Sequence, residues 1–559
     1  MNKNYSSIKN LLIIALIVAL LVLYTNDLFS QADFGQFSGN ISIEAQTYTK
    51  DSIINALDAP EKILTNSSLN MFYRLKGFEV GMRFEAFLNP IYGIDPQYQG
   101  SGIAYKNLTY RGENFEATAG NFYEQFGSGV ILRSYYDPQL GVDNSIEGVR
   151  AVIKPTNGIN IKAIVGTMRK FWTQSNSVIR GADIEMTTQS VLPNLLPNDW
   201  NINAGFSLLS KFEEDNSSSL ILPLNELSWS ARLSLFTSLI NIETEFAFTN
   251  NHPQITNSNT YNEGNATIIN ISYLNEGIGS TLSFHRIDNF DLRGERNARG
   301  NTLTMNYVPS ITKQHTFNEY SLFPFATQLN GEIGIQWELS YYFPENSLLG
   351  GEYGGNINFN FSQVNAIRKD ALDEFTYTSD FFAIGDTMFF RDINVEYNRT
   401  FSMNLDATLR YAYITNNKDL LFFSGAPYYG KVYAHLIGIE SNYIINKDYA
   451  LHCKLENTLQ TQDSVLHNPD NDNGDWISGL AELSIQSKFL VSTLLRYNYG
   501  NEFEDRRILY YNLNATYLMD ATRISLSYGR MSGGILCVGG VCRQVPSTNG
   551  FYFVLTSSF

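Results

Sequence analysis

A strict alternation of apolar and polar side chains begins at Phe37 and recurs along nearly the whole remaining chain. Between residues 226 and 235, for example, apolar side chains such as Trp229 and Leu233 alternate with polar ones such as Arg232. Because successive side chains of a strand point to opposite faces, each such segment predicts a strand with one apolar and one polar face. No helical period is sustained after the first 32 residues, so the sequence predicts an all-β fold.

The connections between these segments are of two kinds, short turns and long polar links. Short turns include Lys76-Gly77, Asn275 to Gly277 and Met519-Asp520. The long links lie near residues 49–66, 124–143, 212–225, 250–263, 287–301, 365–385, 414–430, 461–474 and 531–548. Their alternation along the chain is typical of an outer-membrane β-barrel, in which periplasmic turns are short and external loops are long.

Counting the segments predicts a single large antiparallel transmembrane β-barrel of about 26 strands, with 24 to 26 as the expected range. Four of these strands are expected at residues 302–308, 314–323, 331–343 and 352–364. An even number of strands puts both termini in the periplasm. A barrel of this size has a lumen wide enough for water unless loops fill it.

The N-terminus has the three parts of a secretory signal peptide. Lys3 and Lys9 flank the start of an apolar run from Leu11 to Tyr24, and small residues follow around Ser30-Gln31-Ala32. The run is shorter than the roughly 20 residues of a spanning helix. The sequence therefore predicts a signal peptide over residues 1–32 and a barrel over 33–559. The alternative is an uncleaved N-terminal anchor.

The last ten residues form one more alternating segment, which ends on the aromatic Phe559. This ending resembles the C-terminal signature that outer-membrane barrels present to the barrel-assembly machinery. The expected partners are therefore that machinery, through Phe559, and outer-membrane lipid and lipopolysaccharide. Because alternation starts at Phe37, the sequence leaves no room for the globular plug that precedes the barrel in TonB-dependent transporters. Energised uptake of that type is not expected.

The charges are sparse and acidic. Charged residues make up 17% of the chain and the formal net charge is −16. A nucleic-acid partner is excluded, because such proteins carry a basic stripe. The charges expected to face the lumen are mostly acidic: Glu243, Glu245, Glu332, Glu338, Asp406, Arg410 and Glu482.

Two of the three cysteines, Cys537 and Cys542, flank a short Gly539-Gly540 turn. In an exported protein this spacing predicts a disulfide. The alternative, a metal-binding pair, lacks the further ligands that a four-coordinate site needs. We expect no metal and no cofactor.

The stretch Gly120 to Asn144 packs glycines, aromatic residues and both signs of charge into one connection. If this connection folds inward, it narrows the pore, and its charges set a local field. The residues proposed for this constriction or loop network are Glu124, Arg133, Tyr135, Tyr136 and Asp137. The alternative is an ordered external loop in which Glu124 and Arg133 pair structurally.

The run GNFYEQFGSGVILR at residues 120–133 resembles a family of Bacteroidota outer-membrane proteins of unknown function. A second stretch, from Gln314 to Gly354, carries the same resemblance. The resemblance implies a barrel and a place in the outer membrane of a Gram-negative bacterium. It implies no activity, substrate or catalytic residue.

An enzymatic role has little support in the sequence. The six histidines are scattered, and none forms a spaced metal-binding pair. The acidic run from Asp470 to Asp475 does not fit the calcium loop of an EF-hand, because Pro469 takes the first ligand position. We therefore expect no enzyme.

Two functions remain. The first is a porin-like channel or a transport or export barrel with an acidic lumen. The second is a structural or partner barrel in a secretion or surface-glycan assembly of the envelope, without conductance of its own. Aromatic residues in the long links favour the second, because exposed aromatics favour binding; they are Tyr135, Tyr136, Phe422, Phe423, Tyr428 and Tyr429.

If the lumen is open, its excess of carboxylates predicts that cations cross more readily than anions. The check is the reversal potential of the purified, refolded barrel in a planar bilayer under a salt gradient. A conductance that prefers anions contradicts the prediction.

Overall fold

A computed structural model describes residues 35–559 except 57, 60, 193–195, 198, 218, 421–429, 464–472 and 539–540. The signal peptide predicted at 1–32 lies outside the described residues. So do Phe422, Phe423, Tyr428 and Tyr429, and the first half of the acidic run at 470–475.

The described chain forms one closed barrel of 24 antiparallel strands, with β12 (Thr173–Gln174) as an additional short strand on β11. The wall strands are β1 (Gln36–Thr47), β2 (Ile63–Leu75), β3 (Phe78–Asn89), β4 (Gly100–Arg111), β5 (Phe115–Phe122), β10 (Ile146–Thr156), β11 (Ile159–Lys170), β13 (Val178–Thr187), β14 (Asn201–Phe212), β15 (Asn225–Phe236), β16 (Ile240–Thr249), β17 (Gly264–Asn275), β18 (Ile278–Asp288), β19 (Gly331–Phe343), β20 (Gly355–Ile367), β23 (Ile384–Ser402), β24 (Leu405–Asn417), β25 (Lys431–Asn446), β26 (Tyr449–Gln462), β27 (Trp476–Ile485), β28 (Phe489–Asn498), β29 (Leu509–Met519), β30 (Thr522–Met531) and β33 (Thr548–Ser558).

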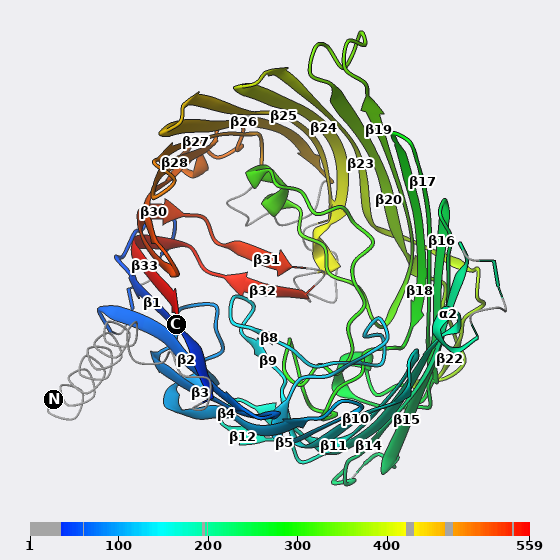
Figure 1. Cartoon of the computed structure of the whole chain (residues 1–559). Coiled ribbons are helices and arrows are strands. Elements are labelled where there is room, and N and C mark those ends of the chain that lie inside the picture. The colour runs from blue at the N-terminus through cyan, green and yellow to red at the C-terminus, as the bar shows by residue number, and fades with distance from the viewer. Residues whose placement is uncertain are drawn as a thin grey trace, which may run out of the picture.

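Each wall strand pairs with the next one along the chain, and β33 pairs with β1 to close the ring (Figure 1). At this seam the register joins Asn40 to Ser558 and Gln46 to Tyr552. Backbone hydrogen bonds also join Gly39 and Phe559 in both directions, at 2.9 and 3.0 Å. The terminal residue is therefore part of the seam, and the ring has no free strand edge.

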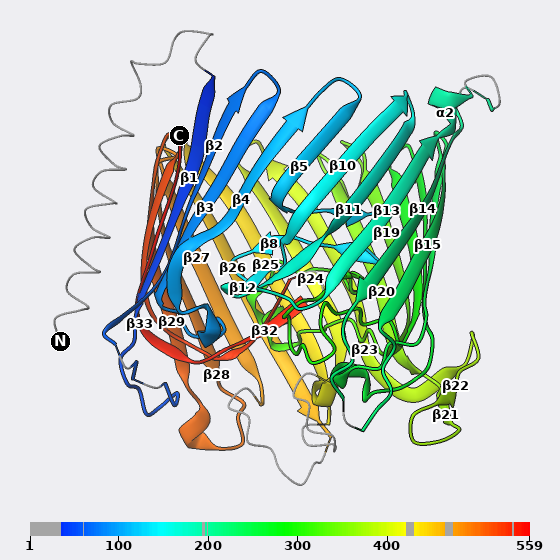
Figure 2. The ribbon, with the colours of Figure 1, turned by 90° about the horizontal axis from the view of Figure 1, so that it is seen from below.

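The two ends of the barrel differ in their connections, as Figure 2 shows. At one end the strands are joined mostly by short turns, with longer links at 188–200, which holds α2 (Thr188–Val191), and at 344–354. The other end carries the long loops, two of which hold the short helices η2 (Pro96–Tyr98) and η6 (Glu504–Arg506). The start of β1 and the C-terminus both lie at the short-turn end. This asymmetry agrees with the sequence prediction.

Two strands expected from the sequence, at 302–308 and 314–323, are absent from the wall. Instead β18 pairs directly with β19, from Ile278 opposite Tyr341 to Asp288 opposite Gly331. Residues 289–330 leave the wall between those strands and fold inside the barrel. The alternation at residues 302–308 arises because Leu303 and Met305 are buried in an interior cluster, and not because these residues belong to the wall. The prediction of about 26 strands is corrected to 24 for this reason.

Large apolar side chains cover the outside of the wall. Near the middle of their strands, Leu409, Leu455 and Leu513 are each more than half exposed. A ring of such side chains matches the apolar band of a transmembrane barrel. None of the helices in the described part of the chain has the length and apolar character needed to cross a bilayer.

Candidate functional site in the barrel lumen

Three connections from the long-loop end fold into the lumen, and together we call them the plug: residues 123–145, 289–330 and 532–547 (Figures 1 and 2). The first holds β6 (Gln125–Phe126), β7 (Leu132–Arg133), β8 (Tyr136–Asp137) and β9 (Val142–Asp143). The second holds η4 (Asn318–Leu322), and the third is the hairpin of β31 (Gly534–Val538) and β32 (Val541–Val545).

Each plug segment starts and ends at wall residues that face each other across a strand pair. The pairs are Phe122 with Ile146, Asp288 with Gly331, and Met531 with Thr548. The wall is therefore continuous beneath each segment. Barrel closure does not depend on any of the three.

The first two segments share an apolar cluster with the inner face of the wall. Plug residues such as Phe126, Ile131 and Met305 pack there with the wall residues Ile164 and Ile179, all nearly inaccessible to solvent. Burying one such side chain contributes roughly 1.5–3 kcal/mol relative to leaving it exposed. Within this cluster the peptide N–H of Arg133 donates to the carbonyl of Met305 at 2.7 Å. The two segments thus form a single packed body.

A buried network of two cations and two carboxylates ties the first segment to the wall. Asp143 in β9 accepts hydrogen bonds from Arg83 of β3 and Arg169 of β11. Glu85 completes the network, 2.8 Å from Arg83 and 2.7 Å from Arg169. All four side chains are at most 4% exposed. In such an environment a charge that loses its partner is costly, so Asp143 holds the segment in place.

The second segment is tied to the opposite part of the wall. The carboxylate of Glu319 in η4 pairs with Arg496 of β28 at 3.0 Å. In the same helical turn, the peptide N–H groups of residues 318 and 319 donate to Glu456 of β26 at 2.9 and 2.8 Å. Just before η4, His315 Nε2 lies 2.6 Å from Asp392 of β23, and its ring stacks on Tyr320. Wall side chains thus hold η4 from three strands.

The residues proposed as a constriction lie in the first segment, but Glu124 and Arg133 have different partners. Glu124 pairs with Arg150 and Lys162 of the wall. The guanidinium of Arg133 lies over the rings of Tyr135 and Tyr307, at 5.0 and 4.0 Å. The proposal that Glu124 and Arg133 pair with each other is therefore wrong.

The two neighbouring tyrosines also face inward. The ring of Tyr136 covers Arg83 at 3.9 Å, and that of Tyr135 borders a cavity in the plug. Burial raises the pKa of both to about 12, so both phenols stay neutral. Asp137 accepts a hydrogen bond from the peptide N–H of Leu140 at 3.0 Å. Tyr135 and Tyr136 therefore lie in the lumen and not on an outward-projecting loop.

A glycine in the family-like run fits the tip of the first segment against the wall. Gly127 has a φ of +55°, and a Cβ there would lie 2.4 Å from Cδ of Arg232. The next residue, Ser128, donates its peptide N–H to Glu245 at 3.2 Å. A side chain at position 127 would therefore push the tip away from Arg232 and Glu245.

The seven charges predicted to face the lumen fall into two groups. Three have partners on the wall: Glu245 lies 3.9 Å from Arg232, Glu332 lies 2.6 Å from the ring nitrogen of His285, and Arg410 lies between Glu396 and Glu440. The other four make no ion pair among the described residues, and each lies in the half of its strand nearer the short-turn end: Glu243, Glu338, Asp406 and Glu482.

The hairpin of the third segment extends across the lumen, and a disulfide joins Cys537 to Cys542 near its tip. The carbonyl of Cys542 accepts a hydrogen bond from the side chain of Asn301 at 2.9 Å. This contact links the hairpin to the second segment. No group of three or more metal-ligating side chains occurs within the described ranges.

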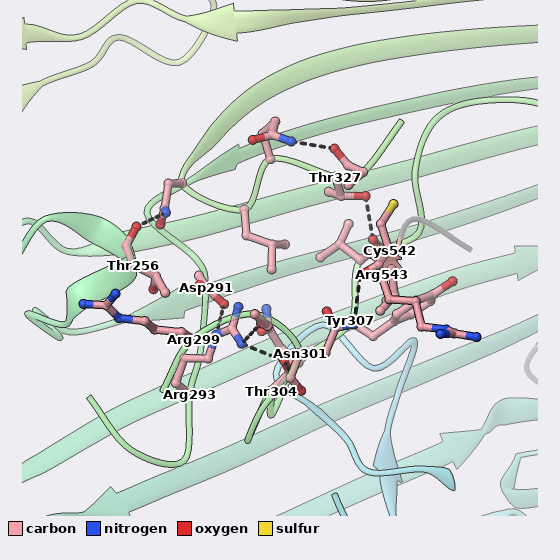
Figure 3. A pocket seen from close by; sticks show the side chains of 18 of the residues that line it. Thr256, Asp291, Arg293, Arg299, Asn301, Thr304, Tyr307, Thr327, Cys542 and Arg543 are labelled. Atoms are coloured by element: carbon pink, nitrogen blue, oxygen red, sulfur yellow. Dashed lines mark hydrogen bonds and ion pairs between the residues drawn. The ribbon is translucent and has the colours of Figure 1, made fainter. Parts of the chain in front are cut away.

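Where the plug segments meet, they border an open cavity of about 840 Å³, which Ile255, Thr256 and Leu420 from other loops also line (Figure 3). Its lining includes Arg293, Arg299 and Tyr307 from the second segment, Tyr135 from the first and Arg543 from the hairpin. A smaller cavity of about 150 Å³ adjoins it, and Arg299 and Arg543 border both.

Sequence reasoning missed the second plug segment and the cavity. One signal was present: inward-facing positions of several strands are apolar, such as Ile164, Ile179 and Ile287. In a water-filled lumen these positions would be polar. Their apolar side chains therefore marked the part of the wall that the plug covers.

Changing Asp143 to Asn should loosen the first segment without opening the barrel. The loss of a buried charge from this network costs roughly 3 kcal/mol, so amide exchange over 123–145 should speed up by on the order of 100-fold. Hydrogen exchange followed by mass spectrometry measures this. Glu113→Gln, which removes the same charge from an exposed turn, is the control. Equal exchange in both variants contradicts the assignment.

Comparisons with known proteins add a family and a set of similar structures. Solved structures that match include the translocation pore of the P pilus usher PapC, at 8% identity and a TM-score of 0.43, with 93% of this chain and 99% of that chain covered. The siderophore receptor PirA from Pseudomonas aeruginosa matches at 10% identity and 0.38, with 95% and 81% covered. The copper transporter OprC matches at 8% and 0.40, with 95% and 81% covered. The comparison with curated proteins finds no match.

A family model described as a family of unknown function, DUF6029, matches residues 8–559, and the chain therefore belongs to this family.

Proposed function

We propose that this chain is a gated transport barrel of the outer membrane, closed at rest by its own plug and opened when the plug moves. The observation that carries the proposal is the construction of the plug. Three segments enter the lumen from the same end, and each is an insertion between paired wall residues. The plug is packed in the lumen, but the strand pairing that closes the barrel does not require it. Such a body is suited to act as a gate.

The outside of the barrel supports the proposed place in the outer membrane. A closed ring leaves no backbone group of an edge strand unpaired, as a bilayer requires. The exposed leucines Leu409, Leu455 and Leu513 suit contact with lipid. We infer a periplasmic short-turn end, with both termini on that side, and a source among the Bacteroidota, in keeping with the family-like run at 120–133.

The acidic side chains without ionic partners define the expected selectivity. Glu243, Glu338, Asp406 and Glu482 all lie toward the short-turn end, whereas the plug fills the other half of the lumen. We infer that they form an acidic vestibule, which favours cations once the plug has moved. No part of this proposal requires an enzymatic activity.

The second candidate is a structural barrel in an envelope assembly. A filled lumen supports it, because such a barrel has no need of conductance. The two candidates predict different conductances for a barrel from which plug residues have been removed: a channel conducts, whereas a structural barrel does not.

Replacing residues 289–330 with the dipeptide Asn-Gly should open the lumen while preserving the wall. Asp288 and Gly331 are paired, so a two-residue turn can join β18 to β19. In planar bilayers we expect the intact chain to be silent or to show only small steps, and the variant to show stable, larger steps that prefer cations.

The matched control replaces residues 368–383, between the paired residues Ile367 and Ile384, with the same dipeptide. This loop lies outside the plug, so the control should conduct like the intact chain. If the plug variant folds as a barrel and stays silent, the gated channel is contradicted and the structural barrel is favoured.

Introducing a charge on the outside of the wall tests the contact with lipid. Leu513 and Asn514 are neighbours in the middle of β29 and point to opposite faces. Leu513→Arg should lower the free energy of unfolding in lipid vesicles by roughly 2–4 kcal/mol. Asn514→Arg, which places the same charge in the lumen, should cost less. Equal losses from the two variants, measured by urea titration, would argue against a lipid-facing exterior.

A further inference from the structure

The charged side chains of the plug are not all compensated. Of its carboxylates, Asp137 alone has no cationic partner within 4.0 Å among the described residues; the others, with their partners, are Glu124 with Arg150, Asp143 with Arg169, Asp291 with Arg293, Glu295 with Lys170, and Glu319 with Arg496. Of its cations, Arg296 and Lys313 also pair with wall carboxylates. Three plug arginines make no ion pair in the described part of the chain: Arg133, Arg299 and Arg543.

These three arginines lie around the same cavity. Arg299 and Arg543 line the 840 Å³ cavity and also the smaller cavity beside it. Arg133 stacks on Tyr135 and Tyr307, and both of those rings belong to the lining of the larger cavity. In the lining of the larger cavity, Arg293, Arg299 and Arg543 outnumber the single carboxylate, Asp291, although the chain as a whole carries a net charge of −16.

Arg543 is the clearest case of a plug cation that makes no ion pair with a described carboxylate. Its Nε and Nη1 atoms are buried, and neither has a hydrogen-bond partner among the residues that the structure describes. Burial lowers the pKa of this guanidinium, and the negative charges of Glu44 and Asp137 oppose the shift without forming an ion pair with it. A buried charge without a counter-charge is disfavoured, and an anion bound in the cavity that Arg543 lines would supply that counter-charge.

Arg299 differs from Arg543 because it is exposed to the cavity. Its guanidinium makes no hydrogen bond or ion pair in the described part of the chain, and the adjoining Gly300 has open space on its Cβ side. Figure 3 shows Arg299 and Arg543 on opposite sides of the cavity. One solute that contacts both must therefore be elongated.

We propose that the plug cavity binds an elongated organic solute with two anionic groups, carboxylates or phosphates, held by Arg299 at one end and Arg543 at the other. Guanidinium groups match the geometry of carboxylate and phosphate with paired N–H donors. A volume of about 840 Å³ lies within the usual range of small-molecule sites. Leu329, Ile535 and the ring of Tyr307 provide apolar surface for the body of the solute.

This inference rests on the proposed function, since it names the class of solute that the gate recognises. The acidic vestibule at the far end of the lumen would repel such a solute. Recognition therefore occurs from the long-loop side, where the plug lies.

The test is isothermal titration calorimetry on the full-length, detergent-solubilised chain. The probes are digalacturonate, with two carboxylates, and fructose 1,6-bisphosphate, with two phosphates; lactose is the neutral control. We expect at least one of the anionic probes to bind and lactose not to bind. Comparing the two anionic probes distinguishes a carboxylate from a phosphate ligand.

The double variant Arg299→Gln and Arg543→Gln should weaken binding of the anionic probe by about 10-fold or more, because charge-assisted hydrogen bonds are lost. The matched control, Arg180→Gln with Arg523→Gln, removes the same charge from two exposed wall arginines that make no ion pair in the described ranges. It should bind like the unaltered chain. If the first double variant does not fold, Arg299→Gln alone serves, since this side chain is exposed and makes no hydrogen bond or ion pair in the described part of the chain.

Three outcomes overturn the inference: lactose binds as well as the anions, neither anion binds, or both double variants weaken binding equally. Because binding is measured without a membrane, it is separable from gating. A plug-replaced barrel that stays silent contradicts the gate while leaving the binding result intact. Loss of binding with normal gating contradicts only the binding site.

Discussion

The structure depends first on the pairing of β1 with β33, which turns a long antiparallel meander into a closed ring. Backbone N–H and C=O groups in a bilayer need partners within the protein, and only closure supplies them to both outer strands. Phe559 takes part in this seam through backbone hydrogen bonds with Gly39. Every other feature, including the lumen and its contents, exists because the ring is closed.

A barrel of about eight strands has an interior that its own side chains just fill. A ring of 24 strands is much wider, so the wall side chains alone cannot fill its lumen. The plug fills much of one half of that space with a second core, in which plug residues such as Ile131 pack against inward-facing wall residues such as Ile179. Apolar packing holds the body of the plug, and buried ion pairs at Asp143 and Glu319 fix its position. Such polar contacts require exact partners, whereas the packing tolerates small shifts.

The lumen has opposite charge at its two ends. Carboxylates that make no ion pair with any described residue, such as Glu338 and Asp406, lie toward the short-turn end, whereas Arg299 and Arg543 lie in the plug. This separation follows from the pairing of most plug carboxylates with wall cations, which leaves arginines in excess around the cavity. A solute that enters from the long-loop side therefore meets positive charge first.

The sequence alone determined the all-β class, the alternating long and short connections and the approximate strand number, because a period of two is a local property of each strand. It also placed Cys537 and Cys542 close enough to bond, since only four residues separate them. Only the tertiary structure decided which alternating segments belong to the wall and which charged side chains are paired. Residues 302–308 alternate like a strand but fold inside, because burial against Val130 and Ile131 produces the same spacing as a wall. The ion-pair partners of Glu124 and Asp143 lie far away in sequence, and only the closed ring brings them within reach. The same fold leaves Arg543 without an ion-pair partner among the described residues.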